Sequence, residues 1–245
     1  DMIPFPYKSN LPKYKNKTIY YESSRGCPFN CSYCLSSTIK GVRFFSLDRV
    51  KKDLAYLMEN EIEEVKFVDR TFSCNEDRAI QIMQYILDKN IRTKFHFEIG
   101  ADLISTEFLD FLMKVPEGIF DFEIGIQSTF TPALKAVNRT SDWTTLSKNI
   151  KKLIALGNIH IHLDLIAGLP HENFTRFTQS FNDVYNLKPD KLQLGFLKLL
   201  KGSNIKKEAS QYGYIHQSRA PYQVLANHVL TYDELIKLSQ VENLI

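Results

Sequence analysis

Several features that mark specialised protein classes are scarce in this sequence. No apolar run approaches the ~20 residues that a membrane-spanning helix needs. The 31 basic side chains barely outnumber the 28 acidic ones, and the formal net charge of +3 argues against a strong nucleic-acid footprint. Four cysteines in 245 residues, three of them clustered, do not make a disulfide scaffold. They fit a reducing compartment, so we expect a cytoplasmic protein without a membrane partner.

What is present is an ordinary globular composition. The chain is 44% hydrophobic and 24% charged, which supplies a full core for one barrel-sized domain with short extensions. It starts at Asp1 and stops at Ile245 inside a helical pattern, and we expect a fragment of a longer protein. Three parts are predicted: a leader or linker from a missing N-terminal domain over 1–18, a barrel over 19–203 and a C-terminal extension over 204–245.

The two flanking parts differ in character. Prolines and lysines in the leader are expected to block regular structure and to keep the segment solvated. The extension carries Tyr212, Tyr214 and Tyr222 before a last helical pattern. It either covers the mouth of the barrel or begins a further domain, and the sequence leaves both open.

A strand-then-helix pattern repeats along the chain from Thr18. The predicted strands cover residues 18–22, 64–69, 94–99, 120–127, 159–166 and 191–199. The predicted helices alternate with them over residues 46–60, 76–89, 105–114, 131–137, 143–156 and 174–187. Capping signals begin several helices, and the capping boxes and single caps we predict are Ser73 with Glu76, Asp142, Asn173, and Thr231 with Glu234. The alternation favours parallel β/α units joined by right-handed crossovers.

Residue parity within the strands distinguishes a sheet covered on both faces from a barrel around a cavity. One face of four strands is apolar, whereas the other carries polar or small residues: His96 and Glu98; Glu123, Gly125 and Gln127; His160, His162 and Asp164; Gln193 and Gly195. A doubly wound sheet would be apolar on both faces. We therefore predict an α/β fold, a partial (β/α)6 TIM-like barrel of parallel strands with helices outside. Buried polar residues that satisfy one another are the alternative.

Three cysteines, Cys27, Cys31 and Cys34, lie at C-x-x-x-C-x-x-C spacing in one short loop. Three thiolates can hold three corners of a cubane 4Fe–4S cluster and leave one iron for a ligand that is not protein. Zinc is the alternative, but a closed tetrahedral site would need Cys74 or His96 as a distant fourth ligand. A disulfide does not use three cysteines evenly, and a catalytic thiol normally needs one cysteine and a base.

The cysteine spacing, with Tyr33 just before the last cysteine, resembles the signature of the radical S-adenosylmethionine (radical SAM) superfamily. The resemblance extends over residues 19–203. It is nearest to the branch of elongator-type acetyltransferase subunits, methylthiotransferases, oxygen-independent coproporphyrinogen oxidase and cobalamin-binding radical SAM proteins. It implies a partial barrel whose cofactors are a 4Fe–4S cluster and SAM, cleaved by one electron to a 5′-deoxyadenosyl radical.

The resemblance also implies roles for individual residues. Cys27, Cys31 and Cys34 would ligate the cluster, and Tyr33 would lie against the adenine. Where relatives carry a Gly-Gly-Glu-like segment for the SAM amino group, this chain reads Val-Asp-Arg-Thr-Phe, which leaves Asp69 and Thr71 as local candidates. The other implied SAM contacts are Glu98 for the amino group, Gln127 and Ser128 for the ribose and methionine parts, Arg139 for the carboxylate, Asp164 for the ribose hydroxyls, and Ile166, Leu197 and Leu199 for the adenine.

The function implied is that of a radical SAM enzyme core that cleaves SAM reductively. Residues 1–7 and the Ile-Ala-Gly-Leu-Pro-His-Glu segment resemble cobalamin-binding members, so the parent is expected to use cobalamin through a missing N-terminal domain, for example in methyl transfer. The alternatives are a tRNA-modifying, methylthiotransferase-like enzyme and a non-enzymatic zinc-binding module. An external electron donor such as flavodoxin or ferredoxin is the expected partner. His96, His160 and His162 are substrate-side candidates; the substrate and the groups that react with it are not predicted.

Overall fold

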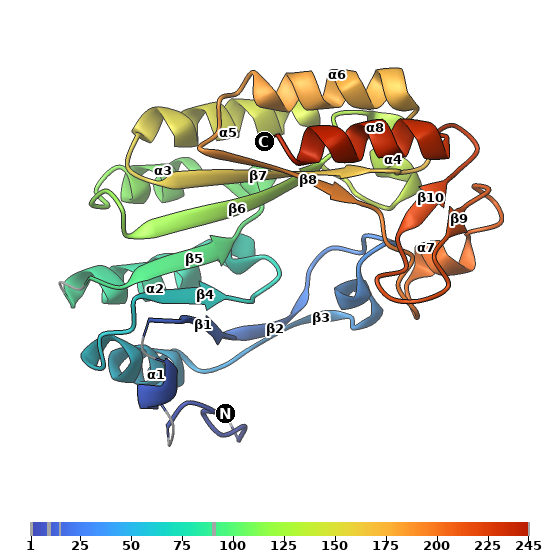
Figure 1. The fold of residues 1–245 in the computed structure, drawn as a ribbon. Coiled ribbons are helices and arrows are strands. Elements are labelled where there is room, and N and C mark those ends of the chain that lie inside the picture. The colour runs from blue at the N-terminus through green and yellow to red at the C-terminus, as the bar shows by residue number, and fades with distance from the viewer. Residues whose placement is uncertain (1, 9–10, 15, 90–91, 245) are drawn as a thin grey trace.

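Six parallel strands form one curved sheet in the computed structural model, which describes residues 2–8, 11–14, 16–89 and 92–244 (Figure 1). The sheet order is β1-β4-β5-β6-β7-β8. These strands are β1 (Thr18–Tyr21), β4 (Glu64–Phe67), β5 (Lys94–Glu98), β6 (Phe120–Gln127), β7 (His160–Ala167) and β8 (Lys191–Phe196). All five neighbouring pairs run parallel. The order leaves β1 and β8 as the two edges, so the predicted partial barrel is confirmed.

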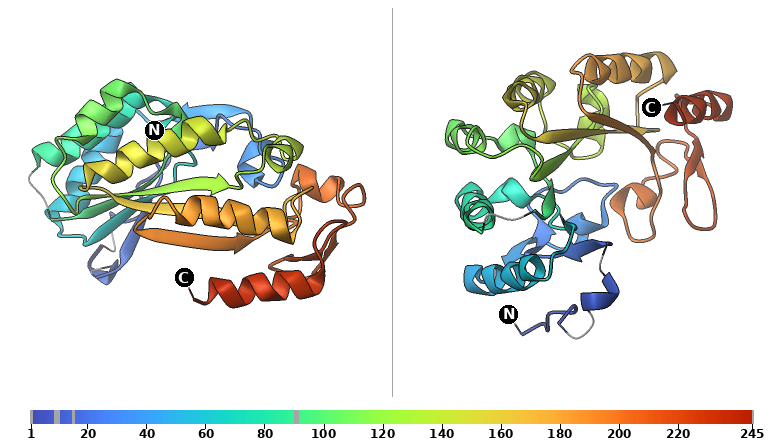
Figure 2. Two further views of the ribbon diagram at one scale, coloured as in Figure 1. Left: turned by 90° about the horizontal axis from the view of Figure 1, so that it is seen from above. Right: turned by 60° about the vertical axis from the view of Figure 1, so that its left-hand side comes forward.

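Helices cover the outer side of this sheet, as Figure 2 shows in its right-hand view. They are α1 (Leu47–Glu59), α2 (Glu76–Asp88), α3 (Thr106–Leu112), α4 (Thr131–Ala136), α5 (Trp143–Leu156) and α6 (Phe174–Tyr185). Short 3-10 helices lie at Leu11–Tyr14, Leu35–Thr38, Phe72–Cys74 and Ala101–Leu103. The inner side faces the cysteine loop and the C-terminal segment.

The core lies between the outer face of the sheet and the helices. Phe67, Phe95, Phe97 and Phe122 are all 0% exposed, and the ring of Phe97 lies 4.7 Å from that of Phe67 between centroids. Burial alternates strictly along β6, with the apolar residues buried and Glu123, Gly125 and Gln127 half-buried on the inner face. The prediction of one apolar and one polar strand face is therefore confirmed, since the apolar side chains are buried on the outer face, beneath the helices.

Most of the predicted helix caps are present. The side chains of Asp142 and Asn173 accept hydrogen bonds from the third residue of α5 and α6, and Thr231 with Glu234 forms a complete capping box. The Ser73–Glu76 box is wrong. Asn75 caps α2, while Ser73 Oγ accepts from the Gly100 amide at 3.0 Å. The Ser73 hydroxyl bonds to the loop after β5, so it does not cap α2 as the local sequence pattern predicted.

A small hairpin that the strand pattern did not predict carries the cysteine loop. It pairs β2 (Ser24–Cys27) with β3 (Gly41–Phe44) in antiparallel register, with Cys27 opposite Gly41. The loop between them is held from two sides, since the Ser32 amide donates to Val137 at 2.9 Å and the Ile205 amide donates to Ser32 at 3.0 Å. Three of the four cysteines of the chain are thereby fixed beside the ends of the parallel strands.

The C-terminal segment packs against the end of β8. It contains α7 (Asn204–Lys207), a two-stranded sheet of β9 (Ile215–His216) and β10 (Val224–Ala226), and α8 (Tyr232–Glu242). Two backbone hydrogen bonds join it to the chain that follows β8. The Leu199 amide donates to the Tyr222 carbonyl, and the Val224 amide donates to the Leu197 carbonyl, both at 2.9 Å. In Figure 1 the helix α8 lies along the outside near α6, whereas α7 and β9–β10 lie beside the opening of the sheet.

The leader is in contact with the barrel rather than fully solvated. Leu11 is 2% exposed, and Phe5 packs edge-on against Tyr21 and Tyr56 at 6.3 and 5.9 Å between ring centroids. Tyr7 Oη donates to the Tyr20 carbonyl at 2.8 Å. The prolines and lysines described in the leader are otherwise exposed, as expected, while Phe5 and Tyr7 are half-buried against β1 and α1.

Candidate functional site

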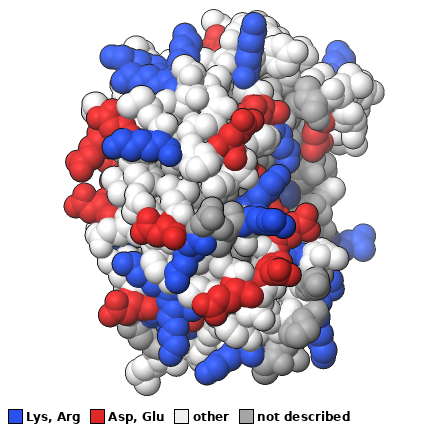
Figure 3. Space-filling view, turned by 90° about the vertical axis from the view of Figure 1, so that its left-hand side faces the viewer, with Lys and Arg blue, Asp and Glu red and all other residues white. Residues whose placement is uncertain are grey.

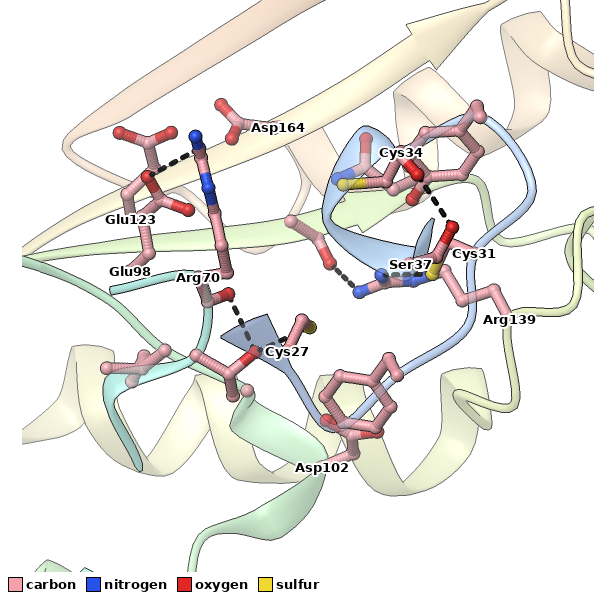
Figure 4. Close-up of a pocket in the computed structure, with 17 residues that line it drawn as sticks. Cys27, Cys31, Cys34, Ser37, Arg70, Glu98, Asp102, Glu123, Arg139 and Asp164 are labelled. Carbon is pink, nitrogen blue, oxygen red and sulfur yellow. Dashed lines mark hydrogen bonds and ion pairs between the residues drawn. The ribbon is translucent and has the colours of Figure 1, made fainter. Parts of the chain in front are cut away.

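A pocket of about 220 Å³ lies where the parallel strands end, and the three thiols of Cys27, Cys31 and Cys34 line it (Figure 4). Its other walls come from the ends of β5, β6 and β7 and from the turn after α4. Six of the predicted SAM contacts line it as well: Tyr33, Thr71, Glu98, Gln127, Arg139 and Asp164. The strand ends and the cysteine loop therefore converge on one cavity, at the end of the barrel where such folds hold their reaction centres.

Asp69 lies behind this pocket rather than in its lining. Its carboxylate is 1% exposed and accepts hydrogen bonds from the Ser23 amide at 2.8 Å, from the Ser23 hydroxyl at 2.7 Å and from the Ser24 hydroxyl. Burial raises the pKa of Asp69, opposed by these hydrogen bonds. The carboxylate thus anchors the start of the strand that leads into the cysteine loop, and its contact with the amino group of SAM stays a prediction.

Four further predicted contacts also lie outside the pocket lining. Ser128 is 1% exposed and follows Gln127, the last residue of β6, whose positive φ of 71° ends the strand alternation. Its hydroxyl donates to Glu172 Oε1 and does not line the pocket. Leu197 and Leu199 are buried beneath the C-terminal segment that pairs with them. Ile166 is half-buried on β7, outside the cavity walls. The adenine contacts that the resemblance implied for these last three are thus not part of the cavity.

Charged residues that were given no role complete the pocket: Arg70, Asp102 and Glu123. Arg70 Nη1 lies 3.8 Å from Glu98 Oε1, and Glu123 Oε2 accepts from His96 Nε2 and from Lys66 Nζ, both at 2.9 Å. The alternation of residues along the strand placed Glu123 on the inner face, and this was the sequence signal that could have identified it as a pocket residue. Arg70 occupies a loop in which the motif of the relatives is absent, so no pattern pointed to it.

The electrostatics of the lumen differ between its carboxyl groups. Hydrogen bonding from His96 and Lys66 holds the pKa of Glu123 far below its usual range, against the effect of burial. Burial raises the pKa of Glu98, opposed by Arg70, and burial raises the pKa of Asp164, opposed by His162. His162 Nε2 lies 3.1 Å from Asp164 Oδ1. Glu98 and Asp164 therefore bind a proton more readily than exposed carboxylates do.

A second cavity of about 410 Å³ opens at the other end of the lumen, and Glu123 lines both cavities. Its walls include the three histidines noted in the sequence: His96, His160 and His162. Figure 3 shows basic and acidic side chains interspersed over the end of the molecule at which the strands begin, without a patch of one sign. The histidines therefore lie on the opposite side of Glu123 from the thiols, among mixed charges.

Behind the pocket, Ser128 belongs to a buried network around Glu172, and Glu172→Gln is expected to stabilise the protein at neutral pH. Glu172 Oε1 accepts from Ser128 at 2.7 Å and from Ser180 at 2.6 Å, whereas Oε2 is buried without a hydrogen-bond partner in the described part of the chain. Burial raises the pKa of this carboxyl above its ordinary value of 4.5. The folded state then binds more protons than the unfolded state above that value, so parental stability falls as pH rises.

Urea unfolding at two pH values checks this. At about pH 8 the glutamine variant should be more stable than the parent by on the order of 1 kcal/mol, because it avoids burying a charge. At about pH 4, where Glu172 is protonated in both states, the difference should shrink toward zero. An equal destabilisation at both pH values would contradict the assignment.

The residues that line the pocket fit a 4Fe–4S cluster. Three thiols from one loop border one cavity, and the Arg139 guanidinium lies beside Cys31 with its buried Nε lacking a hydrogen-bond partner among the described residues. In the described chain no group of three His, Cys, Asp or Glu side chains converges on a single ion. Ligands of a cubane bind different iron atoms and so need not converge on one point.

Comparisons with known proteins point to the same chemistry. The family model described as "Radical SAM superfamily" matches residues 21–184. A second, described as "Protein of unknown function (DUF4080)", matches residues 210–245. No helix among the described residues is long and apolar enough to cross a membrane. The first match runs from the last residue of β1 into α6 and leaves out β8, and the second covers most of the C-terminal segment.

Three relatives illustrate the similarity. A 2-(S-pantetheinyl)-carbapenam-3-carboxylate methyltransferase from Streptantibioticus cattleyicolor is 26% identical over 176 residues, 66% of this chain and 24% of that protein. A ribosomal protein uS12 methylthiotransferase, RimO, from Geotalea uraniireducens is 24% identical over 209 residues, 77% of this chain and 45% of that protein. The cobalamin-dependent radical SAM methyltransferase TokK from Streptomyces tokunonensis is 23% identical over 179 residues, 67% of this chain and 25% of that protein.

A solved structure agrees with the fold. The radical SAM methyltransferase TsrM from Kitasatospora setae, with cobalamin and a 4Fe–4S cluster bound, superposes with a TM-score of 0.72 at 15% identity over 91% of this chain and 45% of that one. The chain thus spans between a quarter and a half of the lengths of these relatives. Because the superfamily model matches well over half of the 245 residues, and three thiols line a pocket at the strand ends, the chain belongs to the radical SAM superfamily.

Proposed function

We propose that this chain is the barrel of an enzyme that cleaves SAM reductively at a 4Fe–4S cluster. The observation that carries the proposal is the convergence of Cys27, Cys31 and Cys34 with Glu98 and Asp164 on one pocket at the strand ends. Three sulfur ligands leave one iron open, and acidic side chains on the same wall suit the amino and hydroxyl groups of SAM. When bound, the cluster supplies one electron that converts SAM to methionine and a 5′-deoxyadenosyl radical.

In this proposal the protein residues bind the cluster, orient SAM and shield both from bulk water. Cys27, Cys31 and Cys34 hold the cluster, and Tyr33 lies against the adenine. Glu98 accepts from the SAM amino group, with Arg70 at 3.8 Å limiting the charge on that wall. Asp164 accepts from the ribose hydroxyls, and Gln127 contacts the ribose or methionine part. The enclosing strand ends exclude bulk water from the reacting centre, which is the contribution of a protein to cofactor chemistry.

For the whole protein we propose cobalamin-linked methyl transfer. TokK and TsrM are named as cobalamin-dependent or cobalamin-bound methyltransferases, and both are similar to this chain over the barrel. The substrate carries polar groups, because Arg70, Asp102 and Glu123 line the pocket beside the thiols. An external one-electron donor such as flavodoxin or ferredoxin completes the reaction. We propose the cytoplasm as its compartment, where free thiols persist.

A tRNA-modifying enzyme similar to methylthiotransferases is the second candidate, supported by the similarity to a probable threonylcarbamoyladenosine tRNA methylthiotransferase from Pyrococcus abyssi. RimO is also a methylthiotransferase by name, but of a ribosomal protein. Such an enzyme would bind RNA with an affinity that falls steeply as salt rises. Electrophoretic shifts with bulk tRNA at two salt concentrations distinguish it from a small-molecule methyltransferase. Zinc in stoichiometric amount in a colourless preparation would instead support a metal-binding module without radical chemistry.

Anaerobic reconstitution tests the main proposal. Purified protein is loaded with iron and sulfide, reduced with dithionite and incubated with SAM, and the products are separated by liquid chromatography with mass detection. We expect about four irons per chain and formation of 5′-deoxyadenosine with methionine. A preparation that holds its full iron and still leaves SAM intact under reduction would refute reductive cleavage.

A further inference from the structure

The turn that follows α4 bonds to the cysteine loop through its backbone and is closed by a hydrogen bond of its own. The Val137 carbonyl accepts from the Ser32 amide at 2.9 Å, and the Arg139 amide donates back to Leu134 at 2.9 Å, which closes the turn. Val137 is 0% exposed, and Asn138 has a left-handed φ of 55°. The backbone from which the Arg139 side chain extends is therefore held in place beside the cysteine loop.

The guanidinium of Arg139 bridges a thiol and a strand carbonyl. Nη1 lies 3.8 Å from Cys31 Sγ, and Nη2 donates to the carbonyl of Gly125 on β6. Figure 4 shows the side chain extended from its turn toward Cys31, with its far end beside the strand. Cys31 is itself only 6% exposed. A fixed positive charge thus lies beside the most buried of the three sulfurs, where solvent screens it least.

The end of β6 is shaped to accept this guanidinium. Gln127 has φ 71°, and the register between β6 and β7 shifts between Gly125 and Gln127. A Cβ at position 125 would lie 2.2 Å from Gln127 Nε2 and 3.9 Å from Arg139 Nη2. The missing side chain at position 125 therefore makes room for the Gln127 amide, while the irregular strand end presents the Gly125 carbonyl to Arg139.

We propose that Arg139 is a positioning residue that orients Cys31 and stabilises negative charge on its sulfur, and so raises the reduction potential of the cluster. This rests on the proposed cluster. The added electron increases negative charge on the cluster and its ligands, and an N–H donor with a positive charge favours that state. The role differs from pairing with the SAM carboxylate, because the structure directs the two terminal nitrogens to Cys31 and Gly125.

A redox titration without SAM tests the proposal. The reconstituted parent, Arg139→Gln, Arg139→Lys and Arg70→Gln are poised at stepped potentials, and the reduced cluster is followed by electron paramagnetic resonance. At a fixed potential, Arg139→Gln should lower the ratio of reduced to oxidised cluster about tenfold, a midpoint lower by about 59 mV for one electron. Arg70→Gln is the matched control, since it removes an equal charge from the same pocket without touching a thiol, and should change the ratio less than about threefold.

Each outcome decides the proposal. Arg139→Lys keeps the charge but has one nitrogen in place of a fork that reaches both partners, so its midpoint should fall between those of the parent and Arg139→Gln. It also remains informative if Arg139→Gln does not retain iron. An unchanged ratio in Arg139→Gln, with SAM binding weakened in calorimetry, would overturn the inference and return Arg139 to the SAM carboxylate. Failure of the parent to take up iron would instead refute the proposed function.

Discussion

A Cys31→Ala variant is expected to fold and to lose its cluster. Cys31 lies in the loop between β2 and β3, outside the aromatic core between sheet and helices, so truncating it leaves the barrel packing unchanged. With two sulfurs left, a cubane is held at too few corners, and iron should fall from about four per chain to a small fraction. Formation of 5′-deoxyadenosine should cease. Circular dichroism checks the fold, iron analysis with visible absorbance checks the cluster, and liquid chromatography with mass detection checks for 5′-deoxyadenosine in the same preparation.

Cys74→Ala is the control for this substitution. Cys74 follows β4 in a 3-10 helix, is half-buried and does not line the pocket. Burial raises the pKa of its thiol, which disfavours the thiolate that binds iron. Its loss should therefore leave iron content and SAM cleavage unchanged. A Cys31→Ala protein that keeps cluster absorbance and cleaves SAM would contradict the ligand assignment.

The barrel was predictable because the local pattern and the tertiary requirement agree in its strands. In β6 the apolar residues Phe122, Ile124 and Ile126 are all buried, and Glu123 with Gln127 lines the inner cavity. When helices cover only one face of a sheet, such an alternation determines which side chains face the helices and which face the cavity. The helix ends at Asp142 and Asn173 follow from equally local chemistry, since each cap bonds within its own first turn.

The hairpin that holds the cysteines was not predictable in this way. Ser24–Cys27 contains no alternation of apolar and polar residues, and its partner strand Gly41–Phe44 lies beyond the whole cysteine loop. The start of β2 is also held by Asp69, a residue distant in sequence, whose carboxylate accepts hydrogen bonds from Ser23 and Ser24. Strand formation here is set by non-local hydrogen bonds, which residue propensity does not report.

The same contrast divides the predicted site. Glu98, Gln127 and Asp164 share the inner-face parity of their strands, and they line the pocket. Ser128 follows the positive-φ residue that ends β6, and its hydroxyl bonds to Glu172 outside the pocket lining. The resemblance implied that Leu197 and Leu199 contact the adenine; in the structure their backbones pair with Tyr222 and Val224, and both side chains are buried. Whether a side chain lines the pocket depends on strand register and on the C-terminal segment, neither of which the motif contains.

Gly26→Ala is expected to disrupt cluster assembly from a position that has no metal-binding group. Gly26 precedes Cys27 in β2 and has φ 108°, a conformation that residues with a Cβ rarely adopt. An added Cβ would lie 2.1 Å from the carbonyl oxygen of Gly41, which belongs to the backbone of the paired strand. A flexible side chain could move aside, but this oxygen is fixed by the hairpin. Relief therefore requires β2 and β3 to separate, which displaces Cys27 from the other two thiols.

Gly118→Ala isolates this steric effect from the cost of the backbone conformation. Gly118 also has a positive φ, 80°, but an added Cβ there meets nothing within 4 Å. Both variants should lose on the order of 1 kcal/mol from the strained φ. Only Gly26→Ala should also lose most of its iron and its SAM cleavage, while the far-ultraviolet circular dichroism of both retains the barrel signal. Equal iron content in the two variants would mean that the hairpin tolerates the overlap, and that the position of Cys27 does not depend on the β2–β3 pairing.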